Sequence, residues 1–238
     1  MIRKLFLILK KDPIICAPLV VWALSYELLG FLVPDLLTNP FHMSGWFLGM
    51  VFLKLLFSAM TILLTAYAVA DRVVSFNLLM AALKKSIGAL MVVFVIIDLL
   101  PRLGMFLILG EQTVEELMTA TQQYSWVYLA VSFIWGVMVL LFMVSHQYIL
   151  LEHYSAFRAL KASASFVRRY IRPIIWLLLQ LVVFSILGLY LQVFLILGPE
   201  WFNGFVAVIR GVFLASIYGM ITLFFIDYTQ PKVSTLIE

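Results

Sequence analysis

The sequence contains few charged residues: Asp, Glu, Lys and Arg make up 12% of its 238 residues. A typical soluble domain carries about 25% charged and about 45–50% apolar residues. Here 65% of the residues are hydrophobic and the mean hydropathy is +1.11. A soluble protein of this size cannot cover so much apolar surface, and disordered chains are poor in apolar residues. The composition excludes both classes and predicts an all-α polytopic membrane protein, with one integral membrane domain over residues 1–238.

Residues that bind metals or carry out catalysis are also scarce. Cys16 is the single cysteine, which excludes an intrachain disulfide and a multi-thiolate metal site. His146 and His153 lie about 10.5 Å apart along a helix, too far for one metal ion. The sequence contains no G-x-S-x-G, H-E-x-x-H, P-loop or C-x-x-C motif. We therefore expect no metal, no cofactor and no enzymatic activity.

Long apolar runs, in contrast, are abundant. A spanning helix needs about 20 predominantly apolar residues, and six windows qualify: 14–33, 45–70, 88–110, 126–150, 173–198 and 204–226. With an even number of spans, both termini lie on one side of the membrane. Thirteen of the 16 Lys and Arg residues fall in the segments on that side, and none falls in the opposite loops. The positive-inside rule therefore places both termini in the cytoplasm, in a bacterial-type inner membrane.

Three cytoplasmic segments combine basic residues with helix-forming apolar patterns. The apolar stripes comprise Ile2, Leu5, Phe6 and Leu9 in the first segment and Phe157, Leu160, Ala164, Val167 and Ile171 in the third. Residues 74–87 form the second segment. Basic amphipathic helices lie in the membrane interface and attract anionic headgroups, at about 1 kcal/mol per basic residue. The alternative is that these segments only anchor the topology. The expected anionic-lipid contacts are Lys10, Lys11, Lys84, Lys85, Arg158, Lys161, Arg168, Arg169 and Arg172.

A basic interfacial helix followed by a transmembrane hairpin occurs three times, which suggests a threefold parallel repeat over residues 1–70, 71–150 and 151–226. The stretches 83–110 and 160–198 show this order most clearly. They resemble poorly characterised six-span bacterial membrane protein families, and their layout is similar to the membrane domain found beside some glycerophosphodiester phosphodiesterases. The 238 residues contain no counterpart of the phosphodiesterase's catalytic domain, so the resemblance implies no such activity.

Ionisable residues inside the predicted spans are the strongest functional signal. Each costs roughly 2.5–3.5 kcal/mol at a helix centre, and such residues mark ligand or ion sites by default. Asp98 and Arg102 share a helix face, and Pro101 between them interrupts the backbone hydrogen bonds. The set, in the middle or outer half of the membrane, is Glu27, Lys54, Asp98, Arg102 and Arg210.

The expected pairing of these charges leaves one cation over. Glu27 and Lys54 lie at similar depth on adjacent spans, so we expect them to form a salt bridge. Arg210 is then the surplus cation, and Gln192 lies at a depth where it can join Arg210. One hypothesis is an outward-facing cavity of net charge +1 for a carboxylate, a phosphate or a lipid headgroup. The alternative is a structural ion-pair network that fixes helix packing.

These features predict a non-enzymatic membrane protein that acts as a small-solute or lipid transport component, or as a membrane subunit of one. Its expected partners are membrane lipids, together with a partner membrane subunit or further copies of the chain, and no nucleic acid. One alternative is a scaffold or assembly factor that binds anionic lipids or a partner protein. Another is a lipid-modifying intramembrane enzyme, with Asp98 or His146 as its acid–base group.

Overall fold

The computed structural model describes residues 1–32, 40–72, 74–100, 130, 133–196 and 203–229, and this part of the chain contains helices and no strand. The all-α expectation is therefore confirmed. A 3₁₀ turn (Pro13–Cys16) joins α1 to α2, and a π-helical segment (Val95–Leu99) continues α4. The labelled helices are α1 (Ile2–Lys11), α2 (Ala17–Leu32), α3 (Pro40–Val69), α4 (Phe76–Phe94), α7 (Ser145–Glu152), α8 (Ala156–Arg169), α9 (Ile171–Ile196) and α10 (Asn203–Thr229).

Within the described residues, five helices are long and apolar enough to cross a membrane: Gly49–Val69, Phe76–Ile97, Phe133–Glu152, Ile171–Gly188 and Gly204–Thr229. Four of them fall largely within one predicted window each. Phe76–Ile97 instead begins well before the window 88–110, because α4 also includes most of the segment 74–87, which the sequence predicted to be interfacial. The first window, 14–33, contains instead a shorter apolar stretch, Pro13–Leu28, that comprises the 3₁₀ turn and most of α2. The chain is thus a multi-pass membrane protein by length and composition of its helices, and a sixth span stays a prediction.

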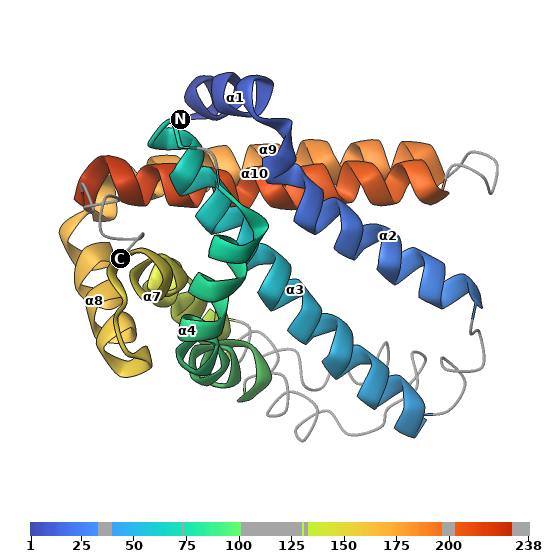
Figure 1. The fold of residues 1–238 in the computed structure, drawn as a ribbon, viewed down its shortest axis with the longest axis horizontal. Coiled ribbons are helices and arrows are strands. Elements are labelled where there is room, and N and C mark those ends of the chain that lie inside the picture. The colour runs from blue at the N-terminus through green and yellow to red at the C-terminus, as the bar shows by residue number, and fades with distance from the viewer. Residues whose placement is uncertain (33–39, 73, 101–129, 131–132, 197–202, 230–238) are drawn as a thin grey trace.

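Helix α10 is the centre of the packing. It contacts α2, α9 and α3, while α4, α7 and α8 pack together beside α3 (Figure 1). The contact between α2 and α10 is very close at Gly211, where an added Cβ would lie 2.4 Å from the Cα of Val20. Because glycine has no Cβ, it allows the two backbones to approach in this way. This close approach sets which side chains of α2 and α10 can meet.

The three predicted interfacial helices correspond to different features of the structure. The first is α1, but its apolar stripe is divided: Leu5 is buried against Gly219 of α10, whereas Phe6 is 69% exposed. The second does not exist as a separate helix, because α4 begins at Phe76, capped by the Ser75 hydroxyl, and runs without a break to Phe94. A threefold repeat therefore stays a prediction, since the second copy lacks the short helix of the first and third.

The third interfacial helix is α8, and the middle of its apolar stripe is buried within the protein. Leu160 and Val167 lie in the core, and α8 packs on α4 and α7. Phe157 and Ile171, at the two ends of the stripe, are exposed. Protein therefore covers the middle of the stripe and leaves its ends open. An amphipathic pattern reports that one face is apolar but not what covers that face.

The predicted interruption near Pro101 has a structural counterpart in α4. Residues Val95–Leu99 form a π-helical segment, and the indole Nε1 of Trp135 donates a hydrogen bond to the carbonyl of Ile97 at 3.3 Å. Pro101, four residues after Ile97, has no N–H to donate to that carbonyl. The indole supplies a donor from the neighbouring span, which satisfies a backbone acceptor in an apolar setting.

Candidate ligand cavity

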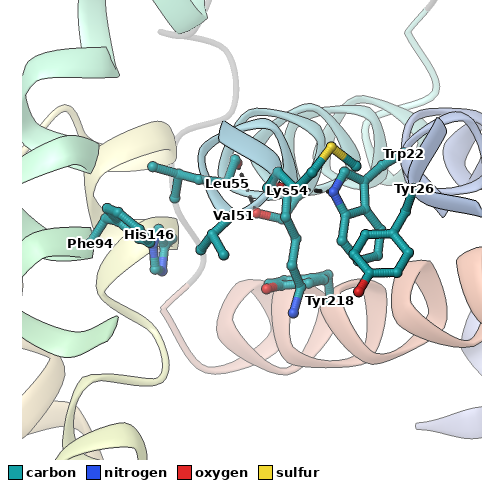
Figure 2. Close-up of a pocket in the computed structure, with 10 residues that line it drawn as sticks. Trp22, Tyr26, Val51, Lys54, Leu55, Phe94, His146 and Tyr218 are labelled. Carbon is teal, nitrogen blue, oxygen red and sulfur yellow. Dashed lines mark hydrogen bonds between the residues drawn. The ribbon is translucent and has the colours of Figure 1, made fainter. Parts of the chain in front are cut away.

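A cavity of about 250 Å³ lies among α2, α3, α4, α7 and α10 (Figure 2). Its apolar wall consists of Met50, Val51, Leu55 and Phe94. Its polar or aromatic wall consists of Trp22, Tyr26, Lys54, Ser58, His146 and Tyr218. Lys54 lies about 22 Å along α3 from Val69, at about 1.5 Å per residue, so Lys54 itself lies well inside its predicted span.

Lys54 is the charged residue that the cavity presents. Figure 2 shows its side chain extending from α3 into the space that Trp22 and Tyr218 also line. The ammonium lies 5.7 Å from the centroid of the Trp22 ring, a distance at which a cation is attracted to the aromatic face. The Trp22 indole is itself held by a 2.9 Å hydrogen bond to the carbonyl of Met50. None of the described lining residues is acidic, so the cavity carries a positive charge.

The expected pairing of Glu27 with Lys54 is wrong. Instead, the Arg210 guanidinium donates to Oε1 of Glu27 at 2.7 Å. The physical reason is the packing: α2 lies along α10, and Gly211, next to Arg210, brings the two backbones together. Glu27 therefore meets the cation of α10 rather than that of α3. Among the described residues, the cation left without a carboxylate is therefore Lys54 and not Arg210.

Three other predicted site residues are not placed by the described part of the chain. Asp98 lies in the π-helical segment and Gln192 lies in α9, but their side chains are outside the described residues. Arg102 is outside them altogether. The expected Asp98–Arg102 contact and the contribution of Gln192 thus stay predictions.

Several cavity residues were not singled out from the sequence. Trp22 and Tyr26 stand four residues apart on α2, with ring centroids 5.9 Å apart, and this aromatic spacing beside a membrane-embedded charge was a usable signal. His146 was assigned to the cytoplasmic interface. A turn at residues 143–144 interrupts the span before α7 begins at Ser145, and His146 then lines the cavity with Nε2 buried.

Among the described residues, no group of three or more His, Cys, Asp or Glu side chains could hold a metal ion. His153 is separated from His146 by the rest of α7 and adopts a left-handed backbone conformation, φ 54°, at the end of that helix. The cavity can offer an anion an ammonium group, hydroxyl groups and an imidazole, and it can offer a short apolar group the side chains of Met50, Val51, Leu55 and Phe94.

No family model, curated protein or solved structure matches this chain. The likeness in layout to six-span bacterial families is thus a resemblance drawn from the sequence pattern alone.

Proposed function

We propose that this protein is a non-enzymatic transport component for a small anionic solute or an anionic lipid, or a membrane subunit of such a transporter, and that it binds the anionic group beside Lys54. The observation that carries this proposal is a cavity among apolar helices that contains an ammonium group and no acidic lining residue among those described. The proposal also includes the inner-membrane location with both termini in the cytoplasm, which rests on the distribution of Lys and Arg.

The energetic cost of a cation within a predicted span supports this choice of ligand. An intramembrane Lys is costly when it has no counter-charge, and such residues are retained where they pair or bind. The Trp22 ring offsets part of that cost through its aromatic face, and a bound anion would offset more. The site thus favours carboxylate or phosphate over a neutral or cationic group.

The volume of the cavity also limits the size of the ligand. About 250 Å³ is slightly below the roughly 300–1,000 Å³ of pockets that enclose drug-sized molecules. The space suits a small organic anion or one headgroup rather than a complete lipid. If the ligand is a lipid, its acyl chains must remain outside, against the membrane-facing helices.

Binding can be measured on the purified full chain in phosphatidylcholine nanodiscs. We expect octanoate and inorganic phosphate to raise the melting temperature of the wild type, and octanol, which has the same chain length as octanoate but no charge, to raise it less. Lys54→Met should abolish the response to both anions, and Lys54→Arg should retain it. Lys84→Met is the matched control, because Lys84 is exposed on α4 and does not line the cavity. An unchanged response in Lys54→Met would refute the proposal.

A scaffold function is the second candidate, and the exposed cations of α8 favour it. The two functions separate cleanly by mutation. Transport through the Lys54 site requires Lys54 and tolerates loss of Arg168 and Arg169, whereas a scaffold that binds anionic lipid or a partner shows the reverse dependence. Complementation of a deletion strain by the two variants would decide between them.

A further inference from the structure

The junction of α8 and α9 brings a row of cations to the start of a membrane span. Helix α8 ends at Arg169 and α9 begins at Ile171, with Tyr170 between them at φ −115° and ψ 31°. The apolar stretch Ile171–Gly188 is long enough to cross the membrane, so this junction lies at the membrane boundary. Figure 1 shows α8 turned away from the line of α9 at this end of the bundle. The arginines at the junction therefore stand at headgroup level.

The exposed face of α8 is positively charged, and its cations have no ion-pair partner in the part of the chain that the structure describes. The inner face, which includes Ala159, Phe166 and Val167, is buried. The exposed basic residues Arg158, Lys161, Arg168 and Arg169 take no part in the three ion pairs found among the described residues.

Two of these arginines are held against aromatic rings. The guanidinium of Arg158 lies 4.2 Å from the centroid of Tyr154, and that of Arg169 lies 5.4 Å from the centroid of Tyr170. Tyr170 in turn packs against Tyr228 of α10. Because the rings restrain them, these charges lose less conformational entropy on binding than freely rotating side chains would.

An exposed apolar face on the first turns of α9 adjoins this charged surface. Arg172 is exposed, and Ile175, Trp176 and Leu179 follow it on the same side of the helix. Trp176 is 69% exposed, and tryptophan is enriched where acyl chains meet headgroups. The cations match the phosphate group of a phospholipid, and the exposed apolar face of α9 that adjoins them matches its acyl chains.

We propose that the α8–α9 junction binds an anionic phospholipid, with its phosphate against Arg168, Arg169 and Arg172 and its acyl chains along the exposed face of α9. The site is separate from the Lys54 cavity and does not depend on the function proposed for it. Three guanidinium groups within five residues can each donate two parallel hydrogen bonds to phosphate oxygens. Leu160, Phe166 and Val167 of α8 contribute nothing to binding, because they are already buried in the protein. The adjoining apolar face of α9 favours a lipid over an acidic protein segment.

The experiment is native mass spectrometry of the full chain released from nanodiscs that contain equal amounts of phosphatidylglycerol and phosphatidylcholine. We expect the wild type to retain phosphatidylglycerol selectively, and Arg168→Gln/Arg169→Gln to lower its affinity roughly 25-fold, from about 1 kcal/mol for each charge. The matched control is Arg3→Gln/Arg72→Gln, which removes two exposed cations that are neither expected lipid contacts nor members of the described ion pairs. The control should retain the lipid as the wild type does.

Two further arms identify the source of the phosphate and the type of contact. Excess inorganic phosphate should leave the lipid bound if the acyl chains contribute, and displacement by phosphate alone would show a site for the free ion instead. Trp176→Ser should weaken retention without abolishing headgroup selectivity. Equal losses in the Arg168/Arg169 and Arg3/Arg72 double variants, or no loss in either, would overturn the proposal; the latter result would leave the α8 cations for another polyanion, such as an acidic protein.

Discussion

Arg210 on α10 donates a 2.7 Å hydrogen bond to Glu27 on α2, and this ion pair neutralises two of the charges that the sequence places inside the membrane. The pairing also affects a residue on a third helix. Because Glu27 is engaged by α10, Lys54 of α3 has no carboxylate among the described residues around its cavity. The structural role and the binding role thus belong to different cations: Arg210 joins helices, and Lys54 is available to a ligand.

The Glu27–Arg210 pair should stabilise the contact between α2 and α10. Its side chains are 33% and 29% exposed, respectively, so we expect Glu27→Gln to lower the free energy of unfolding by about 1–2 kcal/mol, between the values for exposed and buried pairs. Glu27→Gln/Arg210→Gln should recover part of this loss, because no unpaired charge remains. Thermal unfolding in one detergent measures both variants. The single variants Glu27→Gln and Arg210→Gln each lose some free energy of unfolding. If the double variant lost more than these two losses added together, the pair would not be the stabilising contact.

Gly211 should be intolerant of any side chain. Gly211→Ala places a Cβ 2.4 Å from the Cα of Val20, and backbone cannot move aside as a side chain can. We expect a loss of about 1–3 kcal/mol, typical of overpacking, and a weakened Glu27–Arg210 contact. Gly88→Ala is the control, since nothing lies within 4 Å of an added Cβ there and alanine favours a helix. Equal melting temperatures for the two variants would show that α2 and α10 do not pack this closely.

Trp135 should contribute to stability through one hydrogen bond. Trp135→Phe keeps an aromatic side chain but removes the indole donor to the Ile97 carbonyl, and a lost hydrogen bond of this kind costs about 1 kcal/mol. Trp176→Phe, at an exposed position of α9, should cost much less. Unfolding by titration with a denaturing detergent compares the two. A cost at Trp176 equal to that at Trp135 would argue against the role of the hydrogen bond.

His153 should make stability depend on pH. Partial burial, and next the nearby Lys85 ammonium, lower its pKa in the folded protein below the usual 6.5. The unfolded chain therefore takes up the proton first, so the contribution of His153 to stability is lost as the pH falls through about 6.5. The melting temperature from pH 8 to 5.5 should fall less in His153→Asn, which tolerates the left-handed backbone, and less in Lys85→Gln. A wild-type profile in both variants would exclude His153 as the titrating group.

The sequence was a good guide to properties that depend on one helix at a time. Hydropathy located four of the five long apolar helices, whereas Phe76–Ile97 begins well before its predicted window. Pro101 predicted an irregularity in backbone hydrogen bonding, and a π-helical segment, Val95–Leu99, lies just before it in the sequence. Properties that depend on which helices meet were not accessible. Glu27 has a depth compatible with both Lys54 and Arg210, and the choice between them follows from the close packing at Gly211.

The same limit explains the other differences. The apolar stripe of α8 has the same spacing whether lipid or protein covers it, so burial of Leu160 and Val167 could not be read from periodicity. His146 was taken as interfacial because it lies near the end of an apolar run. A turn at residues 143–144 lies just before His146, which lines the cavity, and the sequence contains no strong signal for this turn.

The most direct test of the central claim, that Lys54 binds an anion inside the membrane, is an experimental structure of the wild type in lipid nanodiscs with octanoate, compared with Lys54→Met under the same conditions. We predict density for a carboxylate within hydrogen-bonding distance of the Lys54 ammonium in the wild type and none at that place in the variant, with the Glu27–Arg210 pair intact in both. A dry cavity, or Lys54 paired with an acidic residue of the chain, would contradict the claim and favour a structural role for the charged residues.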